Sequence, residues 1–394
     1  MASVARSGGG RLGRTDRSSF GMWFWEIDRV LLLLVFVLIA VGLIAVAAAS
    51  PATAQRYSGG SVTIAPLNYF WRQLMWVAVG VPVMIGVSML PRDRARRLAL
   101  GGAAFFSVLL AAVPILGYEV NGAQRWIGYG FASLQPSEFL KPCFVVALAW
   151  LLSLRAQDKS LPVIPLSFVL VAVIGAFLMK QPDFGQTIVF GIIWLSLLLL
   201  SGISFRTMGL LAGLGGIGIV AAYLFYPVAT QRIDNFLFAT GDTFQTDSAR
   251  ATLTSGGFFG TGPGGGEKKF GLPEAHTDYI FSVIGEEFGL VACMAIAVLF
   301  LAIVVRVFVK LLDEDEPFIV LASAGLVTQL AVQAMINMAV NVGLAPSKGM
   351  TLPFISYGGS SMIALCLGFG LLLAFTRRNP YLKRSPYVVK WNAR

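Results

Sequence analysis

Residues 30–49 read VLLLLVFVLIAVGLIAVAAA, an apolar run that no charged or polar side chain interrupts. A helix needs about 20 such residues to cross the hydrocarbon core of a bilayer. Lipid offers the backbone no hydrogen-bonding partners, so a membrane-spanning segment must be a helix or part of a closed barrel. The run is continuous rather than alternating, and it therefore predicts a transmembrane helix and not a barrel strand.

Similar runs recur along the whole chain. Of its 394 residues, 56% are hydrophobic and 13% are charged, whereas a soluble domain carries about 25% charged residues. We predict an all-α membrane protein, a polytopic bundle of about ten transmembrane helices. It forms one domain, 29–376, between basic tails at 1–28 and 377–394. The expected spans lie near residues 29–49, 71–90, 98–117, 138–154, 161–181, 184–203, 207–226, 279–311, 317–342 and 355–376.

The net charge of +10 reflects membrane topology rather than nucleic-acid binding. With ten spans the two termini share one side, and that side carries most of the lysines and arginines, in the tails and in short loops such as residues 92–97. Cytoplasmic loops are enriched in these residues. The pattern predicts that both termini are cytoplasmic and that the basic tails contact anionic membrane lipids. Nucleic acid is not an expected partner.

The N-terminus also has features of a cleavable secretion signal, because basic residues and an apolar run precede the sequence AAAS at 47–50. The apolar run is longer than the 7–15 residues typical of such a signal, so we expect an uncleaved first span. Cys143, Cys293 and Cys366 lie inside predicted spans without metal-ligand spacing. We interpret them as small packing residues.

The longest connection, residues 227–277, is expected on the outer side of the membrane. Connections of this length in compact proteins are usually functional or disordered. Its glycine-rich part contains GTGPGG at 260–265, which fits the dinucleotide-binding pattern by letter, but the βαβ context is missing and we exclude a nucleotide site. The acidic triplet 313–315 has the composition of a metal-binding acid pair, and we interpret it as a solvated cytoplasmic turn.

Ionisable residues at the mouths of membrane spans are energetically costly and usually functional. Four clusters are expected to converge on the outer face: residues 121–141, residues 180–185, the loop 227–277 with the start of the next span, and residues 348–361. Cations and carboxylates that face one outer cavity could hold a diphosphate and place an acid to accept a proton. The charged and titratable candidates are Arg125, Glu138, Lys141, Asp183, Arg232, His276, Asp278 and Lys348.

The first two clusters also have structural interpretations. Arg125, which is followed by a tryptophan, could anchor the chain at the membrane interface. Glu138 and Lys141 are three residues apart on one helical face and could form an ion pair. Asp183 could cap the helix that follows it.

The last two clusters have structural interpretations as well. His276 could be a buried structural histidine, and Asp278 could cap the eighth span. Glu286 and Glu287 could be neutral or paired inside the bundle, and Glu286 lies too far along the helix to take the place of Asp278. Residues 348–361 are expected to be non-helical near membrane depth, which requires burial in protein or a polar cavity.

Together these motifs resemble the SEDS family of shape, elongation, division and sporulation proteins. The runs LPEAHTDYIF at 272–281 and GEEFG at 285–289 are similar to the family's signature around its catalytic aspartate, and KGMTLPFISYGGSS at 348–361 is similar to its C-terminal signature. The motifs NGAQRW at 121–126, QPSE at 135–138 and QPDFG at 181–185 match in order and spacing. The resemblance covers about residues 29–376, and its wording is closer to the division branch than to the elongation branch.

The resemblance implies a peptidoglycan glycosyltransferase that polymerises lipid II at the outer face of the bacterial cytoplasmic membrane, at the division septum. Asp278 would be the general base for the acceptor hydroxyl, in one cavity with Arg125, Glu138, Lys141 and Lys348, and cations would stabilise the undecaprenyl diphosphate leaving group. A divalent cation, Mg²⁺ or Mn²⁺, is expected to assist, and no organic cofactor is implied. The expected substrate-binding residues are Arg125, Glu138, Lys141, Asp183, Arg232, Gln245, His276, Lys348 and Ser356. Gln245 belongs to an aromatic-Gln pair whose downstream sequence departs from the family pattern.

The partners implied by the resemblance are lipid II, a single-span class B penicillin-binding transpeptidase, other divisome proteins and membrane lipids. We expect the transpeptidase to dock on the apolar outer surface of the eighth and ninth spans, including residues 320–335. Other functions stay open. A lipid II flippase would depend on charges inside the spans more than on Asp278, a scaffold would need no acid at a cavity mouth, and an elongation-type paralogue would share the chemistry.

Overall fold

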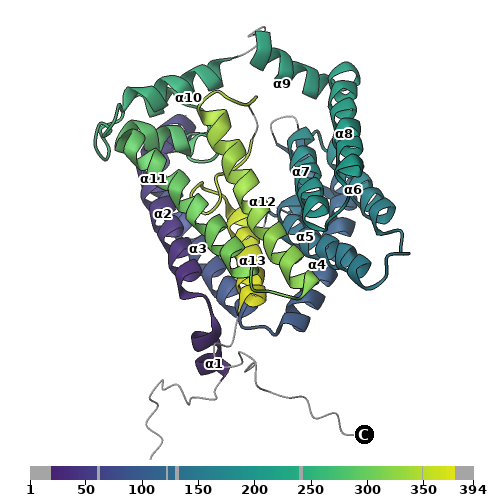
Figure 1. Ribbon diagram of the computed structural model, residues 1–394. Helices are drawn as coiled ribbons and strands as arrows, with labels where there is room; N and C mark the ends of the chain where they lie inside the picture. Colours follow the sequence, from purple (N-terminus) through teal and green to yellow (C-terminus); the bar gives the residue numbers. More distant parts are fainter. Residues whose placement is uncertain are drawn as a thin grey trace, which may run out of the picture.

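The computed structural model describes residues 19–59, 63–120, 123–128, 133–238, 243–347 and 349–377. Its long helices lie side by side in a bundle (Figure 1). A small antiparallel hairpin, β1 (Tyr118–Val120) and β2 (Ala123–Trp126), follows the third long helix. The fold is the helical bundle that the composition predicts.

Nine described helices are long and apolar enough to cross a membrane: α2 (Arg29–Tyr57), α3 (Asn68–Ser88), α4 (Arg92–Leu116), α5 (Pro136–Gln157), α6 (Val163–Lys180), α8 (Phe205–Phe225), α11 (Ile280–Leu311), α12 (Pro317–Asn341) and α13 (Gly359–Thr376). A tenth apolar helix, α7 (Phe184–Leu200), has 17 residues, the short end of the range for a span. Each helix coincides with a predicted span. The chain is a multi-pass membrane protein.

The predicted N-terminal tail, 1–28, is in part folded onto the bundle. Helix α1 (Ser19–Glu26) precedes the first span, and the buried Trp23 indole donates a hydrogen bond to the Ser88 hydroxyl at 2.8 Å. Asp28 caps α2 and forms ion pairs with Arg306 (3.0 Å) and Lys310 (2.9 Å) of α11. These contacts attach the chain to the bundle before the first span begins.

Helices α5, α12 and α13 form the buried centre of the bundle, whereas no described residue of α8 is buried. Figure 1 shows α8 at the edge of the bundle beside α6 and α7. The central position of α12 contradicts one expectation, because most of residues 320–335 are buried and do not offer an outer docking surface. The AAAS sequence at 47–50 lies inside the continuous helix α2, as expected for an uncleaved span.

Two of the three cysteines pack against glycines of neighbouring helices. A Cβ atom added to Gly80 of α3 would lie 2.8 Å from the sulfur of Cys366, and one added to Gly102 of α4 would lie 2.7 Å from the sulfur of Cys143. All three cysteines are buried and unpaired with one another. Their role as small packing residues is therefore confirmed for these two contacts.

The connection between α8 and α11, expected as one long loop over 227–277, is largely helical. It contains α9 (Pro227–Phe238), α10 (Phe244–Ser255) and the short 3₁₀ helix η2 (Lys268–Gly271). Helices α9 and α10 lie across one end of the bundle (Figure 1). Both have only 12 residues, too few for their apolar positions to stand out in the sequence.

The glycine-rich segment 256–266 fills a break in α11. The break occurs at Gly289, whose φ is +78°, and the next two backbone N–H groups donate hydrogen bonds to carbonyl oxygens of the segment. A Cβ atom added to Gly260 would lie 2.1 Å from the carbonyl oxygen of Glu287. Only glycine lets the two backbones approach this closely. The glycine pattern at 260–265 is therefore a packing device, in agreement with the exclusion of a nucleotide site.

Candidate active site

Asp278 lies just before α11, at the end of the bundle where α12 ends. It does not cap α11, because the N-cap position belongs to Tyr279 and no side chain bonds there. Among the described residues no hydrogen bond to the Asp278 carboxylate occurs, and the residue is half-buried. A Cβ atom added to Gly349 would lie 3.2 Å from Oδ2, so the carboxylate faces bare backbone of the segment 349–358.

The surroundings of Asp278 make its carboxylate a weaker acid than usual. Burial raises its pKa from 3.8 to about 7, and the charge of Glu274 acts in the same direction. Arg125 and Arg232 lie close enough to act in the opposite direction and lower this pKa. A carboxylate with a pKa near neutrality can both accept and release a proton under physiological conditions.

Arg125 reaches the site from β2. Its guanidinium donates hydrogen bonds to the carbonyl oxygens of Gln181 (3.1 Å) and Pro182, and its Nε lies 3.8 Å from Asp183 Oδ2. Asp183 also caps α7 by accepting the backbone N–H of Gln186 at 3.2 Å. The capping interpretation of Asp183 is confirmed, and the same carboxylate orients Arg125.

Arg232 reaches the same place from α9. Burial lowers the pKa of Arg232 and the charge of Arg125 lowers it further, while Asp183 and Asp278 oppose this shift. Two guanidinium groups and two carboxylates from separate parts of the chain therefore share one electrostatic environment. An anion such as a diphosphate would relieve the repulsion between the two arginines and accept bidentate hydrogen bonds from them.

Helix α12 holds the backbone of Asp278 with two side-chain amides. The Nδ2 atoms of Asn337 and Asn341 donate hydrogen bonds to the Asp278 carbonyl oxygen at 2.9 and 3.0 Å, and Asn337 also donates to that of Met350 at 2.6 Å. Asn341 Oδ1 accepts the backbone N–H (3.0 Å) and the hydroxyl (2.8 Å) of Ser282. One helix thus fixes both backbone segments that flank the carboxylate.

Ser356 joins the same two segments directly. Its buried hydroxyl donates to the carbonyl oxygen of Thr277 at 2.6 Å and accepts the backbone N–H of Leu352 at 2.7 Å. These bonds occupy the hydroxyl, which was expected to contact substrate. In this structure Ser356 supports the site instead.

His276 has a similar supporting position. Its imidazole is buried between the rings of Tyr69 and Tyr357, with ring centroids 4.5 and 5.1 Å away. Its backbone carbonyl oxygen accepts the N–H of Tyr357 at 2.9 Å. Burial lowers the pKa of His276 to about 4, so the ring is neutral at pH 7. Its Nδ1 is buried and has no hydrogen-bond partner among the described residues, and the expected substrate contact of His276 stays a prediction.

We expected Glu138 and Lys141 to share an open cavity with Asp278. Instead, the two residues lie in the core of the bundle. Their side chains form an ion pair at 2.9 Å, and the two residues are 6% and 1% exposed. Gln186 donates to Glu138 at 2.8 Å, and Lys141 donates to Gln333 of α12 at 3.0 Å. Gln333 in turn donates to the Thr351 carbonyl oxygen at 3.2 Å. The pair therefore supports the segment 349–358 from inside the bundle.

Four further residues that the sequence singled out have different outcomes. Gln245 is exposed near the start of α10, and its expected substrate contact stays a prediction. Lys348 lies outside the described residues. Glu286 accepts the backbone N–H groups of Lys268 (2.7 Å) and Lys269 (2.9 Å), while Glu287 pairs with the Lys269 ammonium. The two glutamates are paired inside the protein, one of the interpretations that the sequence left open.

Three residues of the site carry no motif in the sequence: Gln333, Asn337 and Asn341. They recur at intervals of four and share one face of α12. Amide side chains in an apolar span need hydrogen-bonding partners, because an unpaired polar group is costly there. This spacing is the signal in the sequence that points to them.

Among the described residues, no group of three histidine, cysteine, aspartate or glutamate side chains lies together as metal ligands would. The described part of the chain therefore lacks a complete protein donor set for the divalent cation that the sequence suggests. That cation stays a prediction, and no catalytic step below depends on it.

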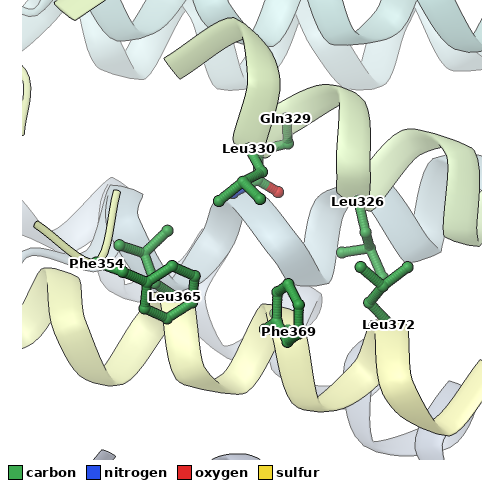
Figure 2. Close-up of a pocket in the computed structure, with 8 residues that line it drawn as sticks. Leu326, Gln329, Leu330, Phe354, Leu365, Phe369 and Leu372 are labelled. Atoms are coloured by element: carbon green, nitrogen blue, oxygen red, sulfur yellow. The ribbon is translucent and has the colours of Figure 1, made fainter. Parts of the chain in front are cut away.

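A small void between α12 and α13 lies outside the site (Figure 2). Its volume is about 20 Å³, room for about one water molecule. The Gln329 amide reaches it, and the oxygen of that amide has no hydrogen-bond partner in the part of the chain that the structure describes. The other lining residues are mainly apolar: Leu326, Leu330, Phe354, Leu365, Gly368, Phe369 and Leu372. The void is too small for a sugar or a prenyl chain.

Comparison with known proteins adds independent information. Residues 28–381 match the FtsW/RodA/SpoVE model, described as cell cycle protein. A probable peptidoglycan glycosyltransferase FtsW of Caulobacter vibrioides is 37% identical over 377 residues, 93% of each chain, and that of Coxiella burnetii is 32% identical over 89% of this chain and 96% of its own.

Solved structures show the same fold. One match is a structure of a peptidoglycan synthase complex, described as "Structural coordination of polymerization and crosslinking by a peptidoglycan synthase complex". It has a TM-score of 0.72 and 27% identity, over 89% of this chain and 97% of that chain. The crystal structure of Thermus thermophilus rod shape determining protein RodA matches with a TM-score of 0.66 and 27% identity, over 89% of this chain and 96% of that chain.

Proposed function

Because this chain belongs to the FtsW/RodA/SpoVE family, we propose that it is a division-type peptidoglycan glycosyltransferase that polymerises lipid II into glycan strands. The curated relatives named FtsW, at 32–37% identity over about 90% of the chain, support the enzyme class and the division role. The single structural observation that carries the proposal is Asp278, a carboxylate with a pKa of about 7 beside two arginines.

The charge distribution supports a location of this site at the outer face of the cytoplasmic membrane. Three basic residues lie at the opposite end of the bundle. Arg92 pairs with Glu314 at 3.3 Å. Arg306 and Lys310 bind an acidic group just before α2, and Lys310 also binds a backbone carbonyl oxygen at the end of α13. Positive residues mark the cytoplasmic side. Lipid II is then polymerised outside, at the septum.

The proposed reaction is a displacement at the anomeric carbon of the lipid-linked donor. The acceptor's 4-hydroxyl oxygen forms the new bond to that carbon while its proton passes to the Asp278 carboxylate. The bond from the carbon to the diphosphate oxygen breaks, and the bonding electrons leave with the undecaprenyl diphosphate. A general base of this kind contributes about 10²–10⁴-fold to the rate.

Arg125 and Arg232 supply the positive charge that the leaving group needs. Negative charge develops on the diphosphate as the bond breaks, and prearranged cations stabilise it more strongly in a site shielded from water. The bonds from Arg125 to the backbone near Asp183 hold that guanidinium in place before substrate arrives. This fixed position reduces the reorganisation needed in the transition state.

The experiment that tests the function is polymerisation of purified lipid II by the protein with its transpeptidase partner. Asp278→Asn keeps the size of the side chain and removes its basicity, so we expect at least a ~10²-fold loss of glycan product. Asp247→Asn on α10 changes an exposed acid and should leave the rate unchanged. A near-normal rate for Asp278→Asn would refute the assignment of the base, and lipid II movement without polymerisation would favour the flippase.

The partner of the proposed enzyme is a single-span class B transpeptidase, supported by the solved peptidoglycan synthase complex that has the same fold. Helix α11 offers a docking surface that α12 lacks. Seven of the exposed apolar residues of α11 and its C-cap recur at alternating intervals of three and four, the spacing at which two packed helices meet: Val291, Met294, Val298, Leu301, Val305, Phe308 and Leu312. We call these seven residues the α11 stripe. Other divisome proteins remain proposed partners, and we assign no docking surface to them.

A further inference from the structure

A second cavity lies at the opposite end of the bundle from Asp278. Its volume is about 530 Å³, and it is formed by the end of α5, the connection between α7 and α8, and the start of α12. Two cations line it, Arg155 and Lys159, together with the hydroxyl-bearing Ser153 and Ser201 and one acid, Asp315. The volume is within the range of pockets that hold small ligands.

Arg155 is incompletely satisfied. Its Nη1 is buried and has no hydrogen-bond partner within the described ranges. A buried donor without a partner is energetically costly, and more so when it carries a charge. Neither Arg155 nor Lys159 lies within ion-pair distance of Asp315 among the described pairs, and the three side chains leave a net positive charge in the cavity. An anionic ligand would satisfy the free guanidinium nitrogen.

The start of α12 brings free backbone N–H groups to the cavity, and the acidic residues 313–316 precede it. Pro317 lines the cavity and occupies the first turn of a 25-residue helix, and no side chain caps that turn. The first backbone N–H groups of a helix have no partner within it, and the helix dipole makes this end positive. The positive end of a central helix therefore lies beside the same cavity as the two cations.

The remaining walls are mainly apolar. Leu152, Leu200, Val320 and Leu321 line the cavity, and Leu200 is also 40% exposed at the edge of the bundle. The adjoining helix α8 has no buried residue among those described, so lipid can reach this edge. The ligand must therefore combine a negative group with an apolar part, and basic residues mark this end as cytoplasmic.

We propose that this cavity binds one glycerophospholipid of the inner leaflet, with the phosphodiester on Arg155 and Lys159 and the start of the acyl chains on the apolar walls. Asp315 accepts a hydrogen bond from a hydroxyl of the headgroup. The chemistry fits an anionic lipid with a hydroxylated headgroup, for which phosphatidylglycerol is the probe. The bound lipid would fill the space between the cytoplasmic ends of α5 and α12, the two helices that hold the Glu138–Lys141 pair and Gln333 at their other ends.

Native mass spectrometry of the full-length purified protein, titrated with phosphatidylglycerol, tests the proposal. We expect one lipid to be retained at concentrations where phosphatidylcholine is lost. The double variant Arg155→Ala/Lys159→Ala should bind it about tenfold more weakly, a change of about 1.4 kcal/mol. The matched control is Arg94→Ala/Arg97→Ala, which removes two exposed arginines of α4 at the same end of the bundle and should bind the lipid like the unaltered protein.

Several outcomes would overturn the proposal. Equal losses in both double variants would show a general attraction of basic residues to lipid and no site. Inorganic phosphate that raises the Tm as much as the lipid does would make free phosphate the ligand. An acidic peptide that displaces the lipid would assign the cavity to a cytoplasmic protein. The Tm of each variant without lipid, expected to equal that of the unaltered protein, excludes misfolding as the cause of weaker binding.

Discussion

The carboxylate of Asp278 lies directly against the backbone of Gly349, so closely that a Cβ atom at position 349 would stand 3.2 Å from Oδ2. The contact joins two segments that are about 70 residues apart in the sequence, the end of the 227–277 connection and the turn before α13. The Asn337 amide of α12 binds the backbone of both segments, and Asn341 binds that of Asp278. The position of the proposed base thus depends on tertiary contacts as much as on its own motif.

Gly349→Ala should impair catalysis without unfolding the protein. The added methyl group would be closer to Oδ2 than an ordinary contact, and the carboxylate would have to move. A displacement of a catalytic group by a fraction of an ångström is expected to lower kcat about tenfold or more, and Gly349→Val should lower it further. The measurement is the rate of lipid II polymerisation by the purified complex.

The control for this change is Gly271→Ala in η2, where an added Cβ atom meets no other atom within 4 Å. It should leave both the rate and the Tm unchanged. If Gly349→Ala polymerised lipid II as fast as the Gly271 variant, the carboxylate would have more room than this contact indicates.

Polymerisation should depend on pH through Asp278. The base must be ionised to act, and burial raises its pKa to about 7, so the rate should rise between about pH 6 and 8 and level off above. Glu274→Gln removes a charge that raises this pKa and should move the midpoint to lower pH. Arg232→Ala removes a charge that lowers it and should move the midpoint to higher pH. A flat profile over this range would contradict the role of Asp278.

The same pKa shift has a consequence for stability. A carboxyl group whose pKa is higher in the folded than in the unfolded protein binds its proton more tightly when folded, so the protein loses stability as pH rises from about 4 to 7. Asp278→Asn cannot ionise and should therefore have a higher Tm than the unaltered protein at pH 8, and a similar one near pH 4. Thermal unfolding of both proteins in one detergent at the two pH values measures the difference.

Asn337→Ala should reduce activity through the position of Asp278. It removes hydrogen bonds to the carbonyl oxygens of Asp278 and Met350. Asn341 still donates to Asp278, whereas the Met350 carbonyl oxygen loses this donor, and a buried carbonyl oxygen without a partner costs about 1–3 kcal/mol. We expect a lower Tm and a fall in kcat larger than the change in KM. Gln329→Ala, two turns earlier on α12 and without a partner for its amide oxygen among described residues, should change the rate little. Equal rates for the two variants would assign Asn337 a structural role alone.

The fold could be predicted from the sequence because each span is recognisable as a long apolar run. The helices α9 and α10 could not be predicted in this way, since short helices at a membrane surface have no such run. Within the site, motifs predicted Asp278, Arg125 and Asp183, and the structure brings them together with Arg232. Motifs could not separate Glu138 and Lys141 from them, because residues that support a site from the core and residues that line it share the same sequence neighbourhood.

The α11 stripe gives the last prediction, which concerns the transpeptidase. Val298 is 62% exposed at the middle of the stripe, and Val298→Trp would hold a partner helix away from α11 while the surface stays apolar and compatible with lipid. We expect the transpeptidase to be lost on co-purification and the polymerisation rate of the mixture to fall to that of the isolated protein. Val169→Trp makes the same change on α6, where Val169 is 54% exposed, and should leave the complex intact. If only Val169→Trp lost the partner, or if both variants kept it, the interface would lie on another helix. The reason is that the contact between two packed helices cannot accept a tryptophan at its centre without separating them.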